Sequence, residues 1–185
     1  MITKKDPSII QSYLEDSSNL NGGYAEEVVF PENYKEVSLF LKEANTTKLP
    51  VTISGGGTGT SGGRIPFGGA VLSMEKLNKI KSIRKENSGG FISCEAGVLI
   101  KDLKSRAEEN GLFYTYDPTE QTAFIGGTIA TNASGARSFK YGSTRQSVSA
   151  LTLAMANGSI FKLERGQIRA KGGKIAFSID KTEYA

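Results

Sequence analysis

Two runs of glycine and hydroxyl-bearing residues carry the strongest chemical signal in the sequence. The first glycine run, residues 54–63, holds six glycines among ten residues, together with Thr58, Thr60 and Ser61. Glycine accepts positive φ and lets the backbone approach a ligand without a Cβ clash. Successive free N–H groups in such turns form nests for anions, typically phosphate. Lys and Arg are absent from the run, so binding would depend on N–H and O–H groups.

The second glycine run, residues 126–135, is also small and rich in hydroxyls, and Asn132 adds an amide donor and acceptor. If both runs contact the same ligand, they favour a long molecule with a central diphosphate, that is, a dinucleotide. Structural alternatives stay open for both runs. The first can be a tightly turned loop without a ligand, and the second a packed turn with a short helix.

Two common nucleotide-binding fingerprints do not fit the first run. Gly57-x-Gly59-x-x-Gly62 follows a predicted strand, but the Rossmann fingerprint must also open a helix and precede an acidic residue by about 20 positions. Pro66 breaks any such helix, and Glu75 comes only 13 residues after Gly62. No Gly-Lys-Ser/Thr follows, so the Walker A pattern fails as well.

Composition excludes several kinds of chemistry. The chain has 185 residues, no His, no Trp and one cysteine, Cys94. These counts exclude histidine-based catalysis, histidine-ligated metals, an internal disulfide and cysteine clusters for zinc or iron–sulfur. Cys94, between Ile92 and Ala96, is expected to be a small buried apolar residue. The net charge of +4 is mild and does not indicate a nucleic-acid partner.

Neither a membrane span nor a leader is expected. No stretch approaches the roughly eighteen apolar residues of a transmembrane helix. The start, MITKKDPSIIQ, has a charged head without a hydrophobic region or a cleavage site. The expected location is therefore the cytoplasm, with no transmembrane segment.

Local signals place the elements around the two glycine runs. Asp6-Pro7 predicts a helix start, and Asn33-x-x-Glu36 is a capping-box pattern before a second helix. Asn157-Gly158 predicts a type I′ hairpin turn. The remaining expected elements are strands over 49–53, 70–74, 91–96, 149–156 and 159–163, and a helix over 99–110 that ends before Gly111, with residues 112–125 irregular.

A strand–helix alternation thus gives way to a half that contains a hairpin. That order predicts an α+β fold with two subdomains rather than one doubly wound sheet. Residues 1–24 are expected to be an N-terminal helical extension, and residues 25–185 the main domain.

Longer motifs resemble the N-terminal FAD-binding domain of FAD-linked oxidases, the PCMH type. They are Gly-Gly-Gly-Thr-Gly-x-Ser-Gly-Gly from Gly55, Asp117-Pro118-Thr119, and Gly-Gly-Thr-Ile-Ala-Thr-Asn-Ala-Ser-Gly-Ala-Arg-Ser-Phe-Lys-Tyr-Gly-Ser-Thr-Arg from Gly126. The resemblance runs from about Glu26 to Gly166. It is strongest to the glycolate oxidase and D-lactate dehydrogenase branch.

The resemblance implies two α/β subdomains with FAD between them, and oxidation of an α-hydroxy acid by hydride transfer to the flavin. It assigns the pyrophosphate to the first glycine run, the flavin side to Pro118 and Thr119, and the flavin and ribityl wall to residues 126–142. It implies no catalytic residue and no metal ligand in this chain. The implied FAD contacts are Ser54, Gly55, Gly56, Gly57, Thr58, Gly59, Thr60, Ser61, Gly62, Pro118, Thr119, Gly126, Gly127, Thr128, Ala130, Thr131, Asn132, Gly135, Tyr141 and Gly142.

The sequence also departs from the family pattern. Ser54 stands where Arg is frequent, and Thr60 where a hydrophobic residue is common. Members with covalent flavin use a His in this loop, whereas this chain has Thr58, so FAD is expected to be non-covalent. The closing segment and the substrate domain do not appear before Ala185. The chain is therefore expected to be a fragment, or to need a partner subunit, and to turn over little alone.

The electron acceptor stays unknown, and two other functions remain possible at this point. One is a non-catalytic subunit that carries FAD or another nucleotide. The other is the FAD domain of an NADPH-dependent cell-wall precursor reductase.

Overall fold

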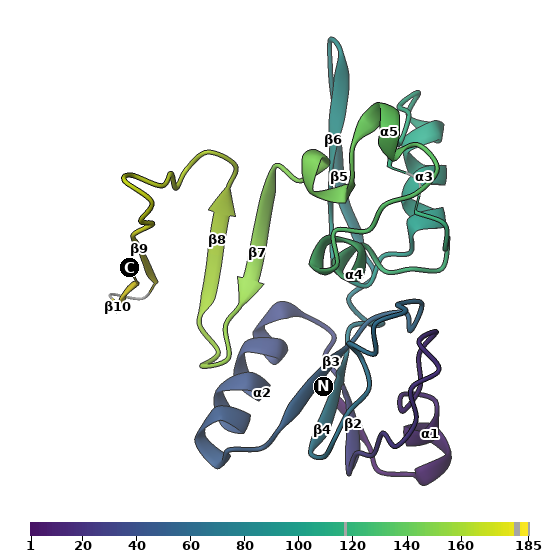
Figure 1. Ribbon diagram of the computed structural model, residues 1–185, viewed down its shortest axis with the longest axis vertical. Coiled ribbons are helices and arrows are strands. Elements are labelled where there is room, and N and C mark those ends of the chain that lie inside the picture. Colours follow the sequence, from purple (N-terminus) through teal and green to yellow (C-terminus); the bar gives the residue numbers. More distant parts are fainter. Residues whose placement is uncertain (117, 180–181, 185) are drawn as a thin grey trace.

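The structure is a computed structural model that describes residues 1–116, 118–179 and 182–184; Asp117 of the predicted motif lies outside them. Figure 1 shows two lobes joined end to end, with a separate hairpin beside them. Within the described residues, no helix is long and apolar enough to cross a membrane.

The first lobe is a four-stranded sheet in the order β1-β2-β4-β3, in which only β1 is antiparallel to its neighbour. Two helices accompany it, α1 beside β2 and α2 on the other side (Figure 1). Its elements are β1 (Ile2–Lys4), α1 (Pro7–Gln11), β2 (Glu27–Phe30), α2 (Tyr34–Thr47), β3 (Val51–Ser54) and β4 (Ala70–Ser73).

The sheet of the first lobe is buried on both faces. In β2, Val29 packs into the core on the α2 side, whereas Val28 packs on the α1 side with Ile10. Leu72 and Val71 of β4 divide in the same way. Successive side chains of a strand point to opposite faces, so a continuous apolar run is what a doubly covered strand requires.

Both predicted helix starts in this lobe are confirmed. The Asp6 carboxylate accepts a hydrogen bond from the Ser8 amide at 2.9 Å, with Pro7 in the first helical position. The Asn33 Oδ1 atom accepts from the amides of Lys35 and Glu36. The Glu36 carboxylate accepts from the Glu32 backbone amide and from the Asn33 side-chain amide, whereas a capping box would use the Asn33 backbone amide.

The second lobe packs helices against a long hairpin. Its elements are β5 (Ile80–Glu86), β6 (Gly89–Cys94), α3 (Ile100–Glu109), α4 (Ile125–Ala130), α5 (Ser138–Tyr141) and the 3₁₀ turn η1 (Thr144–Ser147). The core joins Ile100 and Leu103 of α3 to Ile125 of α4, with Ile80 and Ile92 of the hairpin against them. Strand β5 was not among the predicted elements.

Helix α3 starts without a side-chain cap because backbone carbonyls accept hydrogen bonds from the first N–H groups of the helix. The Ile100 N–H donates to the Ala123 carbonyl and the Lys101 N–H to the Gln121 carbonyl, each at 3.0 Å. A helix start leaves its first amides without helical partners, and residues 121–123 satisfy two of them. The irregular segment 112–125 is thereby fixed to the second lobe, as its position before α4 requires.

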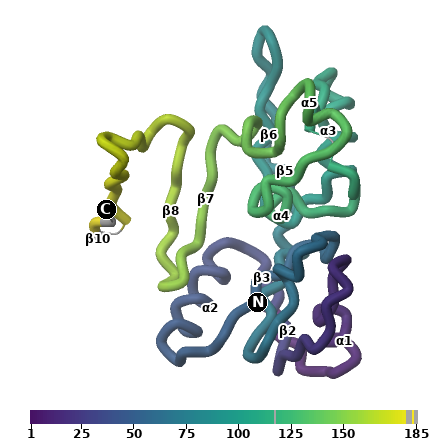
Figure 2. The backbone as a smooth tube through the Cα atoms, viewed as in Figure 1, coloured from purple at the N-terminus to yellow at the C-terminus, as the bar shows by residue number. Residues whose placement is uncertain are grey.

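Beyond η1 the chain forms the hairpin β7 (Ala150–Ala154) and β8 (Ile160–Glu164), then β9 (Phe177–Ile179) and β10 (Thr182–Tyr184). The trace in Figure 2 follows this hairpin beside the second lobe, with its turn at α2 of the first lobe. The predicted type I′ turn is wrong. That turn requires positive φ at both central residues, and here Gly158 has φ +84° whereas Asn157 does not.

The α+β architecture with two subdomains is confirmed. Residues 1–24 hold β1 as well as α1, and both pack on the sheet of the first lobe. The boundary after residue 24 stays a prediction.

The turn at Gly158 gives a stability prediction. A Cβ atom on Gly158 would lie 2.5 Å from the Ser38 carbonyl oxygen in α2. Gly166 has almost the same φ, +83°, but a Cβ there would meet only the end of Arg169 at 3.8 Å. Gly166→Ala should cost about 1 kcal/mol for its left-handed backbone, and Gly158→Ala at least about 1 kcal/mol more for overpacking. Urea denaturation measures both, and equal losses would contradict the contact between hairpin and α2.

The single cysteine gives a second prediction. Cys94 is half-buried rather than fully buried as expected; it packs against the core of the second lobe, and burial raises the pKa of its thiol to about 11 from 9.0. Only the thiolate reacts, so at about pH 8 the native protein should react with a thiol reagent about 100-fold more slowly than the chain in concentrated urea. Stopped-flow absorbance with an aromatic disulfide reports both rates. Rapid labelling of the native protein would show that Cys94 is not packed as described.

Candidate functional site

The first glycine run begins where β3 ends. Strands β3 and β4 are parallel neighbours, so the chain must return along the sheet between them. Residues 55–69 make this return without a helix, which agrees with rejection of the Rossmann pattern. The run therefore lies at the carboxyl edge of the parallel strands, the edge at which open α/β sheets bind ligands.

The backbone of the first glycine run leaves its donors free. Among the described residues, no N–H group from Gly55 to Ser61 donates a hydrogen bond within the chain. A Cβ atom on Gly55 or Gly59 would meet nothing within 4 Å, and Gly57 and Gly62 have positive φ. Successive unpartnered amides in such a turn are what an anion nest consists of.

A cation that sequence reasoning missed lies beside this run. Arg64 folds back on the loop, and its Nη1 donates to the Gly55 carbonyl at 3.2 Å. A Cβ on Gly57 would lie 2.5 Å from that nitrogen. The only sequence signal was its position immediately after Gly63, because the turn that brings Arg64 back depends on the three-dimensional path of the loop.

The second glycine run forms α4 and the turn that follows it. The Thr128 hydroxyl is buried and donates to the Ile125 carbonyl at 2.9 Å. Asn132, at φ +51°, accepts the Arg145 amide on its Oδ1 atom at 3.1 Å. These side chains therefore hold the local fold. Gly127, by contrast, is exposed, and a Cβ there would meet nothing within 4 Å.

The first glycine run meets the segment that leads into the second run, at one junction between the lobes. A Cβ on Gly56 would lie 2.9 Å from the Thr122 carbonyl oxygen and 3.4 Å from the Phe124 ring, directly before α4. Within the second lobe, a Cβ on Gly126 would lie 2.8 Å from that of Ala96, so α4 starts directly against the segment that follows β6. The Gly97 backbone also contacts the first lobe, because its N–H donates a hydrogen bond to the Leu77 carbonyl at 2.7 Å.

A polar cavity of about 420 Å³ opens beside this junction. Its lining comes from both lobes: Glu75, Asn78, Gly97, Leu99, Asp102 and Phe124. Phe124 also contacts the first glycine run, so the cavity and the run share a wall. The volume is within the usual range of small-molecule sites.

Tyr13, in the N-terminal segment, binds one of the residues that line this cavity. Its hydroxyl donates to the Glu75 carboxylate at 2.8 Å. Burial, followed by this hydrogen bond, raises the pKa of Tyr13 to about 12. The phenol therefore remains a neutral donor at physiological pH, and the Glu75 carboxylate is held in one position.

The other predicted contacts are near the second glycine run. Pro118 is buried and pairs with Gly135 through an isolated β-bridge, whereas Thr119 is exposed. Tyr141 stands edge-on to Phe113 at 6.2 Å between ring centroids. Gly142, at φ +85°, ends α5. At the start of the first run, Ser54 is buried and its hydroxyl donates to the Gly55 carbonyl at 3.3 Å.

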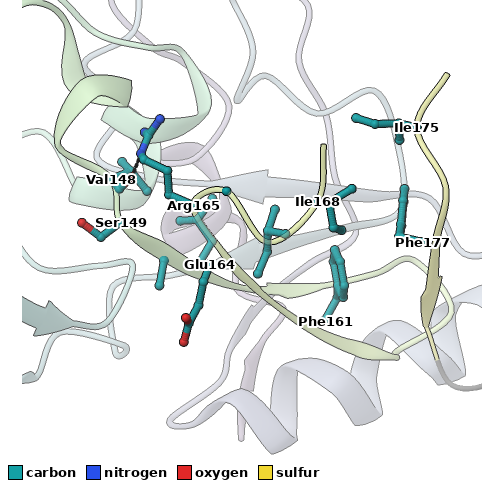
Figure 3. Close-up of a pocket in the computed structure, with 12 residues that line it drawn as sticks. Val148, Ser149, Phe161, Glu164, Arg165, Ile168, Ile175 and Phe177 are labelled. Atoms are coloured by element: carbon teal, nitrogen blue, oxygen red, sulfur yellow. Dashed lines mark hydrogen bonds between the residues drawn. The ribbon is translucent and has the colours of Figure 1, made fainter. Parts of the chain in front are cut away.

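A second, apolar cavity of about 380 Å³ lies elsewhere. Figure 3 shows it under the hairpin β7–β8, where Phe161 and Phe177 stack at 5.3 Å and Arg165 donates to the Val148 carbonyl. None of its lining residues belongs to either glycine run. The candidate site is therefore the junction between the lobes.

Comparison with known proteins places this geometry in a family. The sequence profile of the FAD binding domain matches residues 25–164. D-lactate dehydrogenase of Anaerostipes hadrus is 41% identical over 157 residues, which cover 84% of this chain and 33% of that protein. Glycolate oxidase subunit GlcD of Bacillus subtilis is 34% identical over 166 residues, 89% of this chain and 33% of that subunit. The chain thus spans about a third of the length of these relatives.

Solved structures agree on the fold. Alkyldihydroxyacetonephosphate synthase superposes with a TM-score of 0.77 at 19% identity, over 89% of this chain and 35% of that one. The 6-hydroxy-D-nicotine oxidase of Arthrobacter nicotinovorans gives a TM-score of 0.75 at 21% identity, over 90% of this chain and 36% of that one. With its two lobes and paired glycine runs, the chain belongs to the FAD-binding domain family of PCMH-type FAD-linked oxidoreductases, and its cofactor is FAD.

Proposed function

We propose that this chain is the FAD-binding part of a dehydrogenase that oxidises an α-hydroxy acid, with FAD held at the junction between the lobes. The observation that carries the proposal is the row of unpartnered N–H groups from Gly55 to Ser61, beside the wall that leads into α4. These residues are exposed or half-buried, so their amides are accessible to a ligand, and a diphosphate supplies several acceptor oxygens.

The first glycine run would hold the diphosphate. Gly55 and Gly59 present open backbone, so phosphate oxygens can approach the amides without meeting a Cβ. Thr58, Thr60 and Ser61 can add hydroxyl donors. Arg64 contributes positive charge beside the loop, which partly offsets the two negative charges of the diphosphate.

The second glycine run would form the flavin side. The exposed backbone at Gly127 permits a planar ring to approach α4. Two further residues would border the flavin side. Pro118 pairs with Gly135 through a β-bridge, and Tyr141 packs edge-on against Phe113. Asn132 and Thr128 would act through the local structure they hold rather than by direct contact.

We infer that FAD is bound without a covalent link. The chain has no His, and the loop position used for such links in the family is Thr58. The Cys94 thiol packs among core residues of the second lobe. Binding would therefore depend on hydrogen bonds, charge and shape, without a covalent bond.

The proposed reaction follows from the relatives. The names D-lactate dehydrogenase, glycolate oxidase and D-2-hydroxyglutarate dehydrogenase describe oxidation of α-hydroxy acids. Bound FAD would accept the hydride of the substrate α-carbon and pass the electrons to an acceptor. The chain's own residues would bind and orient the cofactor, and the groups that bind the substrate would come from outside this chain.

Substitution in the open part of the first glycine run tests the diphosphate site. Gly59→Val should raise the dissociation constant for FAD at least about tenfold, because its side chain would occupy the approach to the amides. Gly59 is preferable to Gly57, where positive φ and contact with Arg64 would distort the free loop. Quenching of flavin fluorescence measures the affinity.

Gly89→Val is the matched control, since Gly89 also has open space around it but lies at the far tip of the hairpin β5–β6. It should leave FAD affinity unchanged. Equal affinity in Gly59→Val and wild type would refute the assignment of the diphosphate to this run.

Turnover by the chain alone tests its proposed incompleteness. FAD-loaded protein incubated with D-lactate, glycolate or D-2-hydroxyglutarate should reduce an artificial dye at least about a thousandfold more slowly than a typical enzyme, whose kcat is about 10 per second. The reason is that no residue of this chain is assigned to bind the hydroxy acid. Robust dye reduction with any of the three would show that the substrate site is already present.

A further inference from the structure

Arg64 connects the first glycine run to the N-terminal segment. Its Nη1 donates to the Gly55 carbonyl, and its Nη2 donates to the Ser12 carbonyl just after α1. The guanidinium also stacks over the Tyr13 ring, 5.4 Å from the centroid. One planar group thus joins two parts of the chain that are 43 positions apart, Ser12 and Gly55.

The N-terminal segment contacts the same run at two further points. The Ser17 N–H donates to the Gly57 carbonyl at 3.1 Å. A Cβ atom on Gly62 would lie 2.5 Å from the end of the Leu20 side chain. Residues 12–20 therefore lie along the loop, although they precede the range matched by the family profile, residues 25–164.

Arg64 itself is held in place from the other side. Tyr13 donates to Glu75 after β4 and packs edge-on against Phe30 of β2, with 5.8 Å between ring centroids. Tyr13 is thus fixed to the sheet, and the guanidinium rests on its face. Arg64 Nε is buried without a partner among the described residues, a cost that the two carbonyl contacts and the ring contact must offset.

These contacts orient the peptide planes of the loop. In a planar trans peptide, the carbonyl of one residue and the N–H of the next point in opposite directions. Arg64 binds the Gly55 carbonyl and Ser17 binds that of Gly57, so the Gly56 and Thr58 amides must point away from both. Those two amides belong to the unpartnered row proposed to bind the diphosphate.

We propose that Arg64 is a positioning residue of the diphosphate site, which ties residues 12–20 to the first glycine run and so keeps its N–H groups turned toward FAD. This inference rests on the proposed function of that run. Under this inference, residues 12–20 contribute to the cofactor site, although these residues lie outside the range matched by the family profile. The role requires a group that reaches both carbonyls, and positive charge alone does not meet that requirement.

Three variants test the proposal by FAD affinity. Arg64→Gln should raise the dissociation constant for FAD roughly tenfold, as loss of charge-assisted hydrogen bonds predicts. Arg64→Lys should weaken binding to a similar degree, because a single ammonium cannot span the two carbonyls. Arg84→Gln is the matched control: Arg84 stacks on Phe91 at 5.0 Å in β5, remote from the loop, and its loss should leave affinity unchanged.

Binding of ADP separates positioning from general damage. ADP carries the diphosphate without the flavin, so Arg64→Gln should weaken ADP and FAD by the same factor, whereas Gly127→Leu in the flavin wall should weaken FAD alone. Arg64→Lys retains the charge and the aliphatic stem, so it keeps the test available if Arg64→Gln does not fold. Calorimetric titration measures both ligands, and thermal unfolding of the free protein checks the fold.

The outcomes distinguish the inference from the proposed function. Wild-type affinity for FAD in either Arg64 variant would overturn the positioning role. So would an Arg64→Gln variant that loses FAD affinity and retains ADP affinity. Failure of the wild-type chain to bind FAD at all would instead overturn the assignment of FAD to this junction.

Discussion

The candidate site depends on direct backbone contact between the two lobes. At Gly56 and Gly97 a Cβ atom would lie under 3 Å from backbone atoms of the other lobe, the Thr122 carbonyl oxygen and the Met74 carbonyl oxygen. Interiors pack at crystal-like density, so any side chain at these places would force the lobes apart. The glycines near the junction therefore have two separate tasks. Some let the lobes meet, and others, such as Gly59 and Gly127, leave open backbone for a ligand.

The donors of the first glycine run explain why the site can bind an anion with few cations. The carbonyls of Gly55 and Gly57 are bound from behind by Arg64 and Ser17, and the amides are left to face the other way. A loop held in this way is organised before the ligand arrives, so less conformational entropy is lost on binding. The departure at Ser54 fits this arrangement, since the cation lies after the run instead of before it.

Sequence reasoning succeeded where the controlling contacts are local. The caps at Asp6 and Asn33 act within three residues, so the starts of α1 and α2 could be predicted. It failed for β5, where a register shift between Ile80 and Ser82 places Ile80 and Ile83 on the same side and removes the alternation of a regular strand. Arg64 was missed because its partner Ser12 is 52 positions away. The local pattern Asn157-Gly158 likewise gave a hairpin but the wrong turn, because Met155 pairs with Ser159 and leaves a loop of three residues, 156–158, rather than two.

The contact of the hairpin β7–β8 with α2 forms a second link between the lobes, because the hairpin follows the second lobe in the chain and α2 belongs to the first. The chain already joins them between β4 and β5, and one connection alone would let them swing about it. Gly158 against Ser38 adds a second, distant point of contact, which restricts such motion. In Figure 1 the turn of the hairpin β7–β8 lies at α2. A diphosphate on one lobe and a flavin on the other require a constant spacing, because both belong to one molecule. At the proposed site, the hairpin would therefore contribute to cofactor binding by keeping the two glycine runs at one separation.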